Sequence, residues 1–82
     1  MIKTIVKNEN GRWCIVEKEL TCGNTLYVYI PGNGWTLGRI EHSEKFGGYY
    51  FLSSSDDCYR LCENIEVRTV QEQNELIRAS RL

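Results

Sequence analysis

The stretch Gly34–Phe51 holds the residues whose types could do chemistry together. Trp35 is followed by Arg39, Glu41 and His42. A histidine and a carboxylate that lie close together often act as general acid and base in enzymes. Successive side chains of a β-strand point to opposite faces, so a strand here places Arg39 with Glu41 and turns His42 away. The pattern therefore predicts a same-face ion pair, or cross-strand contacts with the tyrosine-rich segment that follows, in place of a catalytic cluster.

A cysteine–histidine nucleophile pair is the other enzymatic arrangement that these residue types allow, because any of the four cysteines could meet His42 in space. The chain has neither a nucleophile elbow nor a glycine-rich oxyanion loop. We therefore predict that the protein is not an enzyme and has no catalytic residues.

The four cysteines, Cys14, Cys22, Cys58 and Cys62, are the candidate metal ligands. Structural zinc sites favour short C-x2-C pairs, whereas the spacings here are C-x7-C and C-x3-C. Cys58 and Cys62 on one helical face would form half of a zinc site, which Cys14, Cys22 or His42 would complete. We expect instead that Cys58 and Cys62 pack as small apolar side chains, that all four thiols are reduced, and that the protein binds no metal or other cofactor.

Tyrosines supply the candidate binding site. They alternate with apolar residues along Leu26–Ile30, which would place an aromatic strip on the outside of a sheet, and Tyr and Trp are enriched at protein interfaces. The residues that we predict to bind a partner are Tyr27, Tyr29, Arg39 and Tyr49.

Nucleic acid is the alternative partner. Small barrels bind single strands through aromatic side chains surrounded by basic ones. Ten basic and eleven acidic residues give a net charge of -1, so the chain has no overall field to hold a phosphate backbone. We therefore expect a protein partner before a nucleic acid. A small ligand would have to bind at the barrel mouth or at a subunit interface, because the side chains of so small a barrel fill its interior. The residues available to a nucleic-acid site are Tyr27, Tyr29, Tyr49 or Tyr50 with Arg39, Arg60 or Arg68.

Alternating apolar residues and closely spaced turn signals predict an all-β fold for this 82-residue chain. Turns are expected at Asn8–Gly11 and Pro31–Gly34, because Pro restricts φ and an Asn-Gly pair tolerates positive φ. The apolar spacing changes from two to three around Gly38, which predicts a β-bulge there. The predicted strands are 3–8, 12–16, 24–30, 35–42, 48–53 and 65–70.

Two segments are predicted to be helical. The run Ser53–Asp57 is rich in N-cap residues and predicts a short helical insert near Asp56–Cys62, with both cysteines of that segment on one face. The tail 71–82 carries acidic residues early and arginines late, which suits a helix dipole. A short helix is marginal in water, so the tail should either dock Leu76 and Ile77 or fray.

We predict a single domain over residues 1–70, followed by the tail 71–82. Five to six short antiparallel strands should curl into a small barrel, because closure removes edge strands. An SH3-like barrel is the first choice, and a five-stranded oligonucleotide-binding barrel is the second. Trp35 is expected to be the largest single contributor to the core, which consists of Trp13, Ile15, Leu26, Val28, Ile30, Trp35, Leu37, Ile40, Phe51 and Val67.

No targeting signal is apparent. Met1–Lys7 contains a lysine and no apolar run of signal-peptide length, and no stretch approaches the length needed to span a membrane. A cytoplasmic location is the resulting expectation.

Several short motifs follow one another in a characteristic order between Asn10 and Arg68. After an Asn-Gly hairpin come Leu20–Gly23, Leu26–Ile30, Gly34-Trp35, Gly38–His42, Gly48–Leu52 and Ile65–Arg68. This order resembles a family of small Firmicutes proteins of unknown function that are carried by plasmids, integrative elements and prophages. The 53–64 insertion and the tail depart from the family's pattern.

The resemblance implies a small barrel and a mobile-element context, and it implies no activity and no site residues. By analogy with other very small proteins of such elements, it suggests a module that binds, and could inhibit, a host or element-encoded protein such as a defence component.

Overall fold

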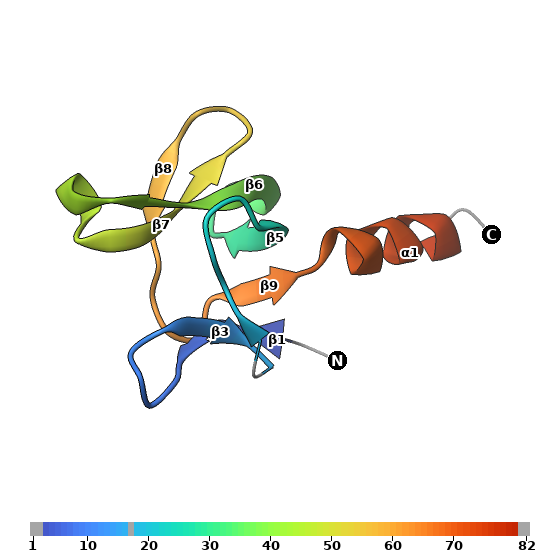
Figure 1. The fold of residues 1–82 in the computed structure, drawn as a ribbon. Coiled ribbons are helices and arrows are strands. Elements are labelled where there is room, and N and C mark those ends of the chain that lie inside the picture. The colour runs from blue at the N-terminus through green and yellow to red at the C-terminus, as the bar shows by residue number, and fades with distance from the viewer. Residues whose placement is uncertain (1–2, 17, 81–82) are drawn as a thin grey trace.

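The computed structural model describes residues 3–16 and 18–80, which form two antiparallel sheets and one α-helix (Figure 1). The larger sheet has six strands in the order β1-β9-β5-β6-β7-β8, and the smaller has three in the order β2-β3-β4. The elements are β1 (Lys3–Thr4), β2 (Val6–Lys7), β3 (Trp13–Ile15), β4 (Lys18–Glu19), β5 (Thr25–Ile30), β6 (Gly34–Ser43), a 3-10 helix (Glu44–Phe46), β7 (Gly48–Ser53), β8 (Cys58–Arg60), β9 (Glu66–Arg68) and α1 (Val70–Ser80).

The mostly β character of the prediction is confirmed, but the predicted closed barrel is not formed by the described residues. The six-stranded sheet begins at β1 and ends at β8, so it keeps two edges. A barrel would need these edges to pair with each other or with the second sheet. The SH3-like closure of the prediction is therefore not confirmed.

The two predicted turns are present, and side chains explain the first of them. The Asn8 carboxamide oxygen accepts hydrogen bonds from the backbone N–H groups of Asn10 and Arg12, both at 2.9 Å, and Gly11 adopts φ 77°. Between β5 and β6, Gly32 adopts φ 90°, a conformation that glycine reaches without steric cost.

The core lies on the inner side of the six-stranded sheet, and β3 of the smaller sheet packs against it. Five residues of the predicted core are buried, and three others, Trp13, Ile15 and Ile30, pack against them in partly buried positions. Ile5 and Leu20 are buried as well, and the sequence prediction missed them. The buried cluster comprises Ile5, Leu20, Leu26, Val28, Ile40, Phe51 and Val67.

The predicted bulge at Gly38 is wrong, and so is the placement of Trp35 and Leu37 in the core. The pairing of β6 with β5 and with β7 continues without interruption through Gly38, which opposes Leu26 on one side and Ser53 on the other. In this register Trp35 and Leu37 point away from the core, and Leu37 is 37% exposed.

The predicted helical insert is also wrong. Asp56 adopts φ 68°, and Cys58–Arg60 is strand β8, which pairs with β7 in a hairpin. The Ser53 hydroxyl accepts hydrogen bonds from the N–H groups of Ser55 and Asp57, so it organises the hairpin turn. Ser and Asp favour helix N-caps and turns for the same reason, which explains the error.

The tail is helical, as predicted, but it neither docks its apolar pair nor frays over residues 70–80. Leu76 and Ile77 are 50% and 41% exposed on α1. A capping box begins the helix: the Thr69 N–H donates to Glu72 Oε1 at 2.9 Å, and the Glu72 N–H donates to Thr69 Oγ1 at 3.0 Å. The tail residues 81 and 82, like residues 1 and 2 of the predicted domain, lie outside the described residues.

Acidification should weaken the start of α1. The hydrogen bond from the Thr69 N–H, assisted by Lys3, holds the pKa of Glu72 below its ordinary value of 4.5. A carboxylate whose pKa is lowered by folding contributes stability in full above its unfolded pKa, and this contribution is lost as the pH falls through the folded pKa. We expect the Cα chemical shifts of residues 70–74 to keep their helical character at pH 4.5 and to lose it only at lower pH, as the lowered pKa of Glu72 is passed. Glu72→Gln should remove this dependence, and Glu75→Gln should retain it; equal behaviour of both variants would contradict the assignment.

Candidate partner-binding face

One face of the six-stranded sheet carries most of the predicted binding residues. Leu26 and Val28 are buried on the inner side of β5, so Tyr27 and Tyr29 point to the other side. Tyr27 opposes Leu37 and Tyr29 opposes Trp35 across the β5–β6 pair. We call this side the outer face; by strand register it includes Tyr27, Tyr29, Trp35, Leu37, Arg39, Glu41, Tyr50, Leu52, Cys58, Arg60 and Arg68.

An aromatic and cationic stack forms the centre of the outer face. The rings of Tyr29 and Trp35 meet edge to face, with centroids 5.5 Å apart and an interplanar angle of 65°. The Arg68 guanidinium lies over the Trp35 ring at 3.9 Å, and Arg68 Nη1 donates to Gln73 Oε1 at 2.9 Å. These contacts hold the rings in place while Tyr29 stays 43% exposed. The stack is thus an ordered aromatic surface open to solvent.

The predicted same-face ion pair is present beside this stack. Arg39 Nε lies 3.4 Å from Glu41 Oε2, and Glu41 opposes Tyr50 of β7. His42 is on the opposite side of β6, where it opposes Tyr49. Glu41 and His42 therefore do not face one cleft, as the alternation predicted.

A hollow of about 200 Å³ opens next to the ion pair. Leu37 and Leu52 supply apolar walls, and Arg39 supplies charge. Gly38 contributes only backbone to the hollow, because a side chain at this position would point to the opposite, buried side of β6, toward Phe51. The residues around the hollow are Thr25, Leu37, Gly38, Arg39, Leu52 and Ser54. Its size and mixed lining suit a single inserted side chain.

Tyr49 is the predicted site residue that the structure separates from the others. It packs against the core on the inner side of the sheet, its ring lies 5.0 Å from that of His42, and the Arg12 guanidinium lies 5.5 Å from its centroid. The odd and even positions of β7 face opposite sides, so Tyr50 occupies the outer face in its place. Three of the four predicted residues, Tyr27, Tyr29 and Arg39, share the outer face.

Sequence reasoning missed Trp35 and Leu37 as surface residues because it assigned both to the core. The available signal was the run Gly34-Trp35-Thr36-Leu37-Gly38, in which the bulky residues alternate with small ones. In a strand, Trp35 and Leu37 lie on one face, and Gly34 and Gly38 lie on the other. Glycines fit the face that packs closely against the core, so this pattern indicates that the two bulky side chains point away from it.

The prediction that Cys58 and Cys62 pack as small apolar side chains of a short helix is wrong, because both are exposed and Cys58 lies in strand β8. Cys14 is buried, and Cys22, Cys58 and Cys62 are exposed free thiols. Among residues 3–16 and 18–80, no three His, Cys, Asp or Glu side chains are grouped so that they could hold a metal ion. That the purified protein is metal-free and reduced stays a prediction.

Alkylation should distinguish the buried thiol from the exposed ones. Iodoacetamide should modify Cys22, Cys58 and Cys62 rapidly in the folded protein, and Cys14 only when the chain unfolds, because Cys14 is 2% exposed. Intact mass after unfolding should show modification at every cysteine, and native mass should show no zinc. Rapid reaction of Cys14, a disulfide, or one bound zinc per chain would contradict this.

No helix in the described part of the chain is long and apolar enough to cross a membrane. Comparison with curated proteins and with solved structures found no match. A family match covers residues 3–69, which includes β1 to β9 and ends just before α1. The chain therefore belongs to the family described as domain of unknown function DUF5348.

Proposed function

We propose that this chain is a non-enzymatic binding module whose outer face binds another protein. The observation that carries the proposal is the exposed stack of Tyr29 and Trp35 beside Leu37 and the hollow. Ordered aromatic side chains next to a pocket are typical of interface hot spots, because they bury a large apolar area at little entropic cost.

The charges on this face favour a protein over a phosphate backbone. The two arginines beside the aromatic stack are already engaged: Arg39 is paired with Glu41, and Arg68 contacts Trp35 and Gln73. A polyanion would have to compete with these contacts and would meet the Glu41 carboxylate. A protein partner with charges of both signs can instead match Arg39 and Glu41 at the rim, which orients it.

Affinity purification from host lysate, with and without nuclease, tests the proposal. The wild-type chain should retain a protein partner after nuclease treatment, and Tyr29→Ala combined with Leu37→Ala should lose it, because truncating hot-spot residues weakens binding by about 2 kcal/mol or more. Leu76→Ala combined with Ile77→Ala is the matched control, since it removes exposed apolar side chains of α1. Equal loss in both double variants, or no partner at all, would refute binding through the outer face.

Single-stranded nucleic acid is the second candidate, and the Arg68–Trp35 stack is the observation that favours it. Bases stack on aromatic side chains of a sheet surface, and arginine adds to such stacking. If the purified chain retained only nucleic acid, with affinity that falls steeply as salt rises and falls again in Arg39→Gln, this function would replace protein binding.

The biological setting is proposed from the sequence resemblance. We place the chain in the cytoplasm of a bacterium, encoded by a mobile genetic element such as a prophage. There it would bind, and could inhibit, a host or element-encoded protein such as a defence component. A small, stable interaction surface without catalytic groups suits a protein that acts by masking its target.

A further inference from the structure

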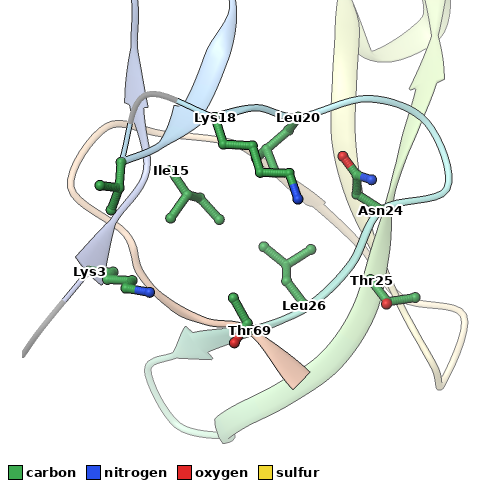
Figure 2. Close-up of a pocket in the computed structure, with 9 residues that line it drawn as sticks. Lys3, Ile15, Lys18, Leu20, Asn24, Thr25, Leu26 and Thr69 are labelled. Atoms are coloured by element: carbon green, nitrogen blue, oxygen red, sulfur yellow. The ribbon is translucent and has the colours of Figure 1, made fainter. Parts of the chain in front are cut away.

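A second cavity, separate from the outer face, lies where the N-terminal strand, the β3–β4 hairpin, the start of β5 and the residue before α1 meet (Figure 2). Its volume is about 290 Å³. Only Thr25 also belongs to the hollow on the outer face. The lining residues are Lys3, Ile15, Val16, Lys18, Leu20, Asn24, Thr25, Leu26 and Thr69.

The floor of this cavity is apolar. Leu20 and Leu26 belong to the buried core, and Ile15 packs against it. Figure 2 shows the side chains of Ile15 and Leu26 directed into the same space. An apolar cavity of about 150 Å³ is enough to accept benzene, so this larger one can accept a short alkyl chain or a substituted ring.

Two ammonium groups stand above the apolar floor. The amino ends of Lys3 and Lys18 point toward the middle of the cavity from opposite sides (Figure 2). Lys3 Nζ already binds a carboxylate, that of Glu72 on α1, at 3.1 Å. The polar groups of Asn24 and Thr69 complete the rim. A ligand that reaches both the floor and the rim needs an apolar body and an anionic head.

Val16 at the mouth of the cavity gives an independent reason to expect a ligand. It adopts φ 46°, in the left-handed region that a β-branched residue rarely occupies, and it is 67% exposed. Glycine or asparagine would relieve the backbone strain at this turn. Backbone strain is often found at ligand-binding sites. A valine in this position would be useful to the protein if its methyl groups covered a bound apolar group.

We propose that this cavity binds a small carboxylate with an apolar body, such as a medium-chain fatty acid. The carboxylate would lie between Lys3 and Lys18, and the chain would lie on Ile15, Leu20 and Leu26 under Val16. The ligand carboxylate competes with Glu72 for the Lys3 ammonium, which couples the cavity to the first turn of α1.

Titration of the full chain with octanoate, followed by two-dimensional NMR, tests the site. We expect saturable shifts at the methyl groups of Ile15, Leu20 and Leu26. Lys18→Gln should weaken binding about tenfold, because a hydrogen bond to a charged group contributes roughly 1.5–3 kcal/mol. Lys45→Gln is the matched control, because Lys45 does not line the cavity. In a separate titration, 1-octanol, which lacks the carboxylate, should bind about tenfold more weakly than octanoate.

Two further variants separate recognition from structural damage. Glu72→Gln frees Lys3 and should tighten octanoate binding, a gain that a misfolded cavity would not produce. Val16→Gly should raise the melting temperature by relieving strain and still weaken binding. Shifts that do not saturate, equal binding of 1-octanol, or unchanged affinity in Lys18→Gln would each overturn the proposal, whatever partner binds the outer face.

Discussion

Gly38→Ala is expected to lower the free energy of unfolding by about 3 kcal/mol or more, the upper range for overpacking a core. A Cβ atom at this position would lie 2.5 Å from Cζ and 2.8 Å from Cε1 of Phe51, and it would also press on the Leu52 carbonyl oxygen. Real Cβ atoms do not approach neighbours this closely, so the strand pair must deform.

Neither neighbour of Gly38 can easily move. Phe51 is 1% exposed, and Leu52 is held by pairing with Arg39 on one side and with Cys58 on the other. Urea unfolding of the variant measures the loss, and Ser54→Ala, an exposed change nearby, should stay within about 0.5 kcal/mol of wild type. A midpoint for Gly38→Ala equal to that of wild type would show that Phe51 does not cover this glycine.

A double-mutant cycle isolates the contact between Gly38 and Phe51. Phe51→Leu shortens the side chain that meets the new methyl group. The double variant should therefore lose less stability than the sum of the two single variants, since residues in contact are not additive. Additive losses would assign the whole effect of Gly38→Ala to the Leu52 carbonyl oxygen.

Phe51→Ala should cost about 3–5 kcal/mol, because it opens a cavity at a fully buried ring. Trp35→Ala should cost only about 1–2 kcal/mol, the value of an aromatic pair with Tyr29 and a cation–π contact with Arg68. This order reverses the expectation from sequence, in which Trp35 was the largest single contributor to the stability of the core.

The same denaturation experiment measures both variants, and circular dichroism confirms that each is folded before its stability is compared. Trp35→Ala should also abolish partner binding while leaving most of the stability. If Trp35→Ala lowered the free energy of unfolding as much as Phe51→Ala, Trp35 would have to be a core residue. The outer face would then lack its proposed central binding residue.

Features that depend on neighbouring residues could be predicted well. Strict alternation along β5 placed Leu26 and Val28 inside and Tyr27 and Tyr29 outside, because the side-chain period of a strand is two. The same rule paired Arg39 with Glu41 and separated His42 from them. The tail helix followed from its charge order and the absence of Gly and Pro.

Features that depend on distant residues could not be predicted in this way. The change of apolar spacing at Gly38 has two explanations, a bulge or a change of face, and the unbroken pairing of β6 with β5 and β7 decides for the change of face. The Ser- and Asp-rich turn at Ser53–Asp57 had a similar ambiguity, which the pairing of β8 with β7 resolves in favour of a hairpin.

Local sequence patterns were sufficient to predict that this chain is mostly β, where its main turns fall, and which face of β5 carries the tyrosines, because each of these depends on local backbone preferences and side-chain period. Tertiary structure decided that the sheets stay open, that Trp35 belongs to the surface, that Tyr49 faces the core, and that Lys3 and Lys18 meet over one cavity. These outcomes depend on which strands become neighbours. Strand pairing brings together residues that are far apart in the sequence, and no local sequence pattern indicates which of them will meet.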